Sequence, residues 1–106
     1  GSTPDFLERL VGVFVADSLS LLAKMEAAVA ARNFGEFRSL LHAMKGSAAS
    51  IGTERLTRLC ATLGKCSDAE LRLQSSSLVR SLNEEFEQGR AALERYLQDK
   101  RSQSAS

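Results

Sequence analysis

The stretch NFGEFRSLLHAMKGSAASIG, residues 33–52, contains a complete helix between a start signal and a stop signal. Asn33 can accept hydrogen bonds from the first-turn N–H groups, and Glu36 can reach back to the Asn33 N–H, as in a capping box. Gly52 is typical of the residue that ends a helix. Between these signals, apolar residues at alternating steps of three and four predict one stripe packed against a core. Its members are Phe34, Phe37, Leu41, Met44, Ala48 and Ile51.

Three further segments show the same apolar spacing and predict three more helices. The first starts at Pro4, because proline is favoured in the first turn, and ends near Arg32. A short helix follows Thr53 as its cap and stops at Gly64, and a long one opens with the capping-box pattern SDAE at residues 67–70. The expected core positions are Phe6 or Leu7, Leu10, Phe14, Leu21, Met25 and Ala28 in the first; Leu56, Leu59, Cys60 and Leu63 in the short one; and Leu71, Leu78, Leu82, Phe86, Leu93 and Tyr96 or Leu97 in the long one.

The predicted fold class is all-α, an antiparallel up-and-down four-helix bundle. Short connections between amphipathic helices favour antiparallel neighbours, and 106 residues suffice for one domain but not for two. We expect residues 4–100 to form this domain, residues 1–3 to be an N-terminal tail left by cloning, and residues 101–106 to be a disordered tail. Gly89 is the expected point of a close contact between helices.

Composition excludes several classes of function. With 43% hydrophobic and 25% charged residues the chain is typical of a globular domain. Its net charge of +1, without a run of Lys or Arg, gives no reason to expect nucleic-acid binding. Cys60 and Cys66 are spaced for neither a redox pair nor a zinc site. No apolar run approaches the ~20 residues of a membrane span, so we expect a cytoplasmic location without direct membrane contact, whether or not a parent protein is anchored in the inner membrane.

The single histidine, His42, is the strongest candidate for a functional residue. It follows the core position Leu41 by one residue, about 100° around the helix, and therefore faces solvent beside the buried stripe. Its neighbours one or two turns away on the same face are Arg38, Ser39, Lys45, Gly46 and Ala49. Residues 38–65 also carry five basic side chains against one acid, which would attract a phosphoryl group or an acidic partner.

These residue types suit the carriage of a phosphoryl group. An imidazole of ordinary pKa, about 6.5, is mostly neutral and nucleophilic at the pH of the cytoplasm. Lys45, one turn away, is placed to stabilise the charge on the oxygens of a transferred phosphoryl group. Gly46 costs the helix roughly 1 kcal/mol relative to alanine, which indicates that a second protein must approach that face closely.

The run His42-Ala43-Met44-Lys45-Gly46-Ser47-Ala48 resembles the His-x-x-Lys-Gly-Ser-Ala signature of histidine-containing phosphotransfer (HPt) domains. The resemblance extends over about residues 14–64, and it implies a four-helix bundle. It also implies that His42 is the phosphoacceptor, that Lys45 helps to hold the phosphoryl group and that Gly46 clears the approach of a receiver domain. The chain departs from the family pattern at Met44, where leucine is frequent, and at Gly64, where glutamate is common.

The resemblance further implies a phosphorelay role in two-component signalling, in which the phosphoryl group passes between His42 and the aspartate of a receiver domain. Magnesium would be supplied by the receiver domain, and the chain would need no cofactor and have no kinase activity of its own. The implied parent is a bacterial hybrid sensor histidine kinase with this domain at its C-terminal end, a kinase of diffusible-signal quorum sensing being one candidate. The residues expected to contact the receiver are Arg38, Ser39, Ala49, Arg55 and Arg58.

Two other functions compete with this interpretation. The dimerisation and phosphoacceptor domain of a sensor kinase also carries a helical histidine, but an acid usually follows it, and a proline a few residues later. Ala43 and the lack of any proline after Pro4 argue against that domain, as does a chain that supplies four helices itself and is therefore expected to be monomeric. The second alternative is a helical adaptor that binds a regulatory protein, and such a partner is also compatible with phosphotransfer.

Overall fold

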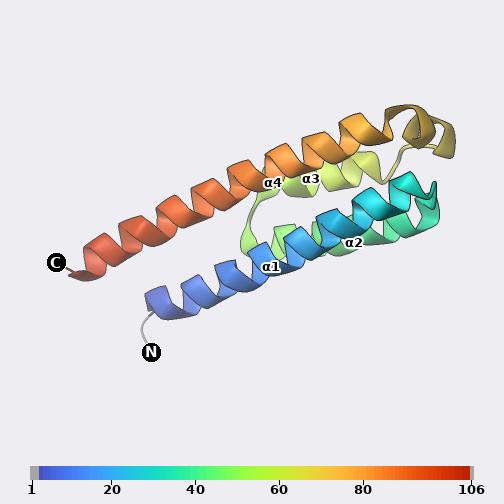
Figure 1. Ribbon diagram of the computed structural model, residues 1–106. Helices are drawn as coiled ribbons and strands as arrows, with labels where there is room; N and C mark the ends of the chain where they lie inside the picture. Colours follow the sequence, from blue (N-terminus) through green and yellow to red (C-terminus); the bar gives the residue numbers. More distant parts are fainter. Residues whose placement is uncertain (1–2, 106) are drawn as a thin grey trace.

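The computed structural model describes residues 3–105, which fold into four helices: α1 (Thr3–Ala30), α2 (Phe34–Ile51), α3 (Glu54–Leu63) and α4 (Asp68–Ala105). Successive helices run in opposite directions and pack on one another, and α4 packs back on α1 (Figure 1). No strand occurs among these residues. The predicted all-α antiparallel bundle is therefore confirmed. None of the described helices combines the length and apolar character that crossing a bilayer requires.

The start of α2 is capped as predicted on one side only. The Glu36 N–H donates to the Asn33 side-chain oxygen at 3.2 Å, which confirms Asn33 as the cap. The predicted return bond, from the Asn33 N–H to the Glu36 carboxylate, does not form. That prediction is wrong because the Asn33 N–H donates to the Ala28 carbonyl at 2.8 Å instead. The turn that ends α1 thus uses the donor that a capping box would need.

The ends of α1 and α2 share one hydrogen-bond pattern. At the end of α1 the N–H groups of Arg32 and Asn33 donate back to the carbonyls of Val29 and Ala28, and Arg32 has a left-handed φ of 57°. The end of α2 closes in the same way around Gly52, whose φ is 87°. Glycine is the usual residue at this position because it has no Cβ. Arginine there costs the fold about 1 kcal/mol.

The remaining caps are mixed. Thr53 does stand before α3, but its hydroxyl donates to the Ala48 carbonyl at 3.0 Å and makes no cap bond, so its predicted capping role is wrong. The Ala48 carbonyl, which also accepts from the Gly52 and Thr53 N–H groups, accepts from that hydroxyl as well. Ser67 and Glu70 form the predicted capping box, with reciprocal bonds of 2.9 and 3.2 Å. Hydrogen bonding to the Ser67 backbone N–H and, second, to the Ser67 side chain lowers the pKa of the Glu70 carboxyl. Gly64 ends α3 as expected.

The core confirms most of the predicted stripe positions, with one correction, at Leu10. Leu10 is exposed rather than buried and borders a hollow beside the end of α2, and of the pair Phe6 or Leu7 it is Leu7 that is half-buried. Leu97, and not Tyr96, is the buried member of its pair. The buried residues that the spacing did not identify are Val11, Ser18, Leu22, Leu40 and Val79.

Two observations concern the long helix α4. A Cβ added to Gly89 would lie 3.1 Å from the Thr53 Cγ2, so the predicted close contact is confirmed, between α4 and the start of α3. The chain is helical through residue 105, where a disordered tail was expected from residue 101, and Arg101 forms an ion pair with Glu8 of α1. The predicted tail at residues 1–3 falls mostly outside the described residues, since α1 already begins at Thr3.

Candidate functional site

His42 lies near the middle of α2 on its exposed face. The opposite face of the helix is anchored in the core by Leu41, Met44 and Ala48, which are almost completely buried. Within residues 3–105 the imidazole makes no hydrogen bond or ion pair, so its nitrogens are not committed to the fold. The structure thus holds a histidine rigidly at the surface with both of its ring nitrogens available for chemistry.

Gly46, one turn beyond His42, borders open space. A Cβ added to it would meet no other atom within 4 Å, and its φ is not left-handed. Neither packing nor backbone geometry among the described residues therefore requires a glycine here. The glycine therefore leaves a stretch of exposed backbone beside His42 that the described residues do not fill.

Lys45, one turn beyond His42, is exposed. Its charge acts to lower the pKa of the Cys60 thiol, but burial has the larger effect and raises that pKa to about 11. Cys60 therefore remains a protonated core residue. Lys45 makes no ion pair within the described residues, which leaves its ammonium group available next to His42.

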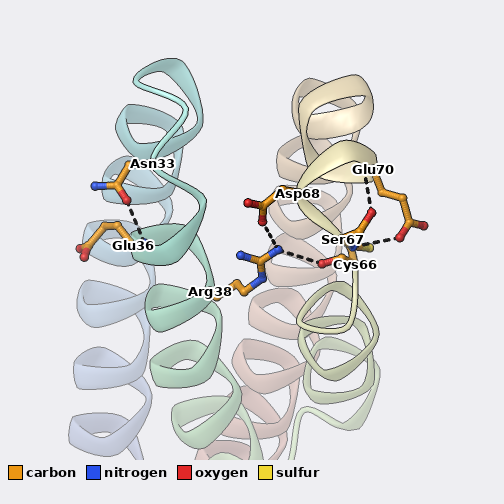
Figure 2. A network of polar contacts seen from close by, with 7 residues as sticks. All are labelled: Asn33, Glu36, Arg38, Cys66, Ser67, Asp68 and Glu70. Atoms are coloured by element: carbon orange, nitrogen blue, oxygen red, sulfur yellow. Dashed lines mark hydrogen bonds and ion pairs between the residues drawn. The ribbon is translucent and has the colours of Figure 1, made fainter.

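Arg38, one turn before His42, is tied to the connection between α3 and α4, as Figure 2 shows. Its guanidinium group donates to the Cys66 carbonyl at 3.0 Å and to the Asp68 carboxylate at 2.5 Å. Only about a third of its side chain is exposed (34%). The structure gives this predicted contact residue a first role inside the chain, where it fixes α2 against the start of α4.

The other predicted contact residues fall into two groups. Ser39 and Ala49 are exposed on the same face of α2 as His42. Arg55 and Arg58 lie on α3, and the Arg55 guanidinium group pairs with Glu85 of α4 at 3.1 Å. Two of the five basic side chains counted from the sequence are thus balanced by acids that lie beyond that stretch, and the excess of positive charge near His42 is smaller than predicted.

An apolar rim beside the site was not predicted. Leu10 and Val13 of α1, 44% and 60% exposed, border a shallow hollow of about 200 Å³ together with Ser47, Ser50 and Ile51 of α2. This hollow lies one to two turns along α2 from His42. Val13 is an apolar residue outside the core stripe of α1. Such a residue is the signal in the sequence from which an exposed apolar rim could have been predicted.

Metal ligands do not gather in the described part of the chain. Among residues 3–105 no group of three or more His, Cys, Asp or Glu side chains is placed to hold one ion. Both cysteines there are free thiols.

Comparison with known proteins gives one consistent family. A family model described as the Hpt domain matches residues 9–103. The chain is 28% identical over 71 residues to the histidine-containing phosphotransfer protein 2 of Arabidopsis thaliana, covering 64% of this chain and 46% of that protein. It is 34% identical over 73 residues to the pseudo histidine-containing phosphotransfer protein 2 of Oryza sativa subsp. japonica, covering 66% and 48%. The chain spans about half the length of these relatives. No solved structure matches it.

Proposed function

The chain belongs to the Hpt domain family, and we propose that His42 is the residue on which it carries a phosphoryl group. A domain of this family is a phosphorelay intermediate in two-component signalling. The observation that supports His42 is its position: it is the only histidine of the chain, it is exposed without a partner among residues 3–105, and it is adjacent to the open patch at Gly46.

The proposed transfer starts with the Nε2 atom of a neutral His42 ring. Its lone pair forms a bond to the phosphorus of an aspartyl phosphate, while the bond between that phosphorus and the aspartate oxygen breaks. The electron pair leaves with the aspartate as a carboxylate, and the ring loses its Nδ1 proton to solvent. Lys45 lies beside the transferred group, where its positive charge offsets the charge on the phosphoryl oxygens. The reverse sequence returns the group to an aspartate.

The proposed partner is the receiver domain of a response regulator, docked over the exposed face of α2. Gly46 lets the receiver backbone approach the ring nitrogen. Leu10 and Val13 add an apolar contact at the rim, of the kind that interfaces bury at their centre. In this proposal the magnesium ion belongs to the receiver domain, and the Hpt domain has no kinase activity of its own. Arg38 acts by holding α2 in place, whereas Arg58 remains a candidate for direct contact.

The proposed parent is a bacterial hybrid sensor histidine kinase that works in the cytoplasm. This rests on the sequence resemblance alone. The receiver domains of such a parent would be both donors and acceptors of the phosphoryl group.

The test is incubation of the domain and its His42→Gln variant with a receiver domain that carries labelled phosphate. We expect label on the wild type only, lost in acid and retained in alkali, because a phosphoramidate hydrolyses in acid. Circular dichroism of the variant shows whether the helices persist. Label that survives acid, or label on the variant, would contradict the assignment of His42.

A further inference from the structure

A second hollow lies between α1 and α4, at the end of the bundle where α1 turns into α2. It has a volume of about 860 Å³, and its wall comes from the end of α1, the start of α2 and the first half of α4. None of its lining residues belongs to the exposed α2 face that carries His42. We call it the basic hollow, after the side chains of Arg32, Arg72 and Arg80 that line it.

Arginines without a carboxylate partner are concentrated in this hollow. Four of the ten arginines, at positions 38, 55, 90 and 101, form ion pairs with Asp or Glu. Among the described residues the other six form no such pair, and three of those six line the basic hollow. Glu26 is the only acid in its wall. The hollow therefore has a net positive charge that the fold does not neutralise.

Arg32 reaches the basic hollow from an unfavourable backbone position. It stands in the left-handed region at the end of α1, where the equivalent position of α2 is occupied by Gly52. Both turns share the same pair of closing hydrogen bonds, so a glycine at position 32 would close α1 without strain. Strain at a position that the fold could have relieved is typical of a residue with a function.

The rest of the wall suits a ligand with both charged and apolar parts. Ser75, Ser76 and Asn83 supply hydroxyl and amide groups, and Val29 and Ala30, which are more exposed than the nearly buried Phe34 and Val79, contribute apolar surface. The volume lies within the ~300–1,000 Å³ of small-molecule sites. Guanidinium groups bind phosphate oxygens in pairs and stack on flat rings.

We propose that the basic hollow binds a phosphate-bearing small molecule of the nucleotide class. The phosphates contact Arg32, Arg72 and Arg80, and the ring system lies against the apolar surface at Val29 and Ala30. Because the hollow is separate from the His42 face, this proposal does not depend on the phosphotransfer role. It adds a ligand to a domain that otherwise exchanges only a phosphoryl group with proteins.

The test is titration of the ¹⁵N-labelled domain with ATP, with adenosine as the probe that lacks phosphate. We expect saturable shifts of the amide signals confined to residues 26–34 and 72–83, with a dissociation constant below about 1 mM, and no saturation by adenosine. The double variant Arg72→Gln/Arg80→Gln should bind ATP at least tenfold more weakly. The matched control Arg58→Gln/Arg95→Gln removes the same charge from exposed arginines outside the hollow and should change the affinity less than twofold.

Arg32→Gly provides a second arm that separates a binding role from a structural one. It should weaken ATP binding several-fold and at the same time raise the denaturation midpoint. Equal weakening by both double variants would overturn the proposal, because it would show attraction by net charge alone. Absence of saturation by ATP would also overturn the proposal and would favour an acidic protein surface as the partner of these arginines. Phosphotransfer to His42 should be unchanged in the Arg72→Gln/Arg80→Gln variant, so the two proposals fail independently.

Discussion

At the scale of single residues, a glycine inside α2 costs about 1 kcal/mol relative to alanine, and at position 46 no atom occupies the space that a Cβ would fill. The fold would accept almost any side chain there. The sequence predicted this glycine as a point of approach, and the open space is consistent with that prediction. His42 was likewise placed correctly at the surface. A residue that follows a buried helix position by one lies about 100° around the helix, and this depends only on local geometry.

Gly46→Gln tests the approach directly. Glutamine is the better helix former, so the free energy of unfolding should rise by up to ~1 kcal/mol, while transfer from a phosphorylated receiver should be blocked by the longer side chain. Urea denaturation and the rate of transfer are the two measurements. Gly46→Ala is the matched control, which should gain the same stability and keep most of the transfer. Full transfer to Gly46→Gln would mean that the receiver docks elsewhere.

Lys45→Ala should slow phosphotransfer by about tenfold, which corresponds to roughly 1.4 kcal/mol of lost stabilisation. The stability of the fold should hardly change, because Lys45 is exposed and forms no ion pair among the described residues. The measurement is single-turnover transfer from a labelled receiver. Lys45→Arg, which keeps the charge, should recover most of the rate, and a slow Lys45→Arg variant would show that charge is not what Lys45 contributes.

At the scale of helices, the turns that end α1 and α2 share the same pair of closing hydrogen bonds but have arginine and glycine, respectively, at the left-handed position. Arg32→Gly should therefore raise the free energy of unfolding by about 1 kcal/mol, and Gly52→Ala should lower it by a similar amount. Chemical denaturation of both variants measures the pair. Destabilisation by Arg32→Gly would mean that the arginine side chain contributes more to the fold than its backbone strain costs.

Helix ends were predictable from sequence where the signal is local. Asn33, Gly52 and the Ser67–Glu70 box all lie within one turn of the helix that they start or end, and each behaves as predicted. The failures come from competition between neighbouring turns. The N–H that Glu36 would have bonded closes α1 instead, and the hydroxyl that would have capped α3 bonds the end of α2. The sequence pattern of one helix does not show which groups of the preceding turn compete for the same hydrogen-bond donor.

At the scale of the whole molecule, the site depends on contacts that no single segment predicts. Arg38 meets Asp68 across thirty residues of chain, and the exposed Leu10 borders a hollow where α2 ends. Periodicity states which face of a helix is apolar, but it does not state how far the neighbouring helix extends. The position of His42 was therefore predictable, whereas its apolar rim and the internal role of Arg38 were not.

The closed ring of four helices predicts that the chain is a monomer in solution. Each helix packs on two others, so no second chain is needed to complete the core. Light scattering coupled to gel filtration should give the mass of one chain, 11.5 kDa. A mass twice as large at micromolar concentration would instead favour a domain that assembles its four helices from two chains.

The most direct test of the central claim is a proton–phosphorus correlation spectrum of the domain after exchange with a phosphorylated receiver. The chain has one histidine, so a phosphoramidate signal coupled to imidazole ring protons can only arise from His42. We predict one such signal, with couplings that place the phosphorus on Nε2. A phosphorus signal without coupling to imidazole protons, or none when the receiver has lost its phosphate to the domain, would contradict it.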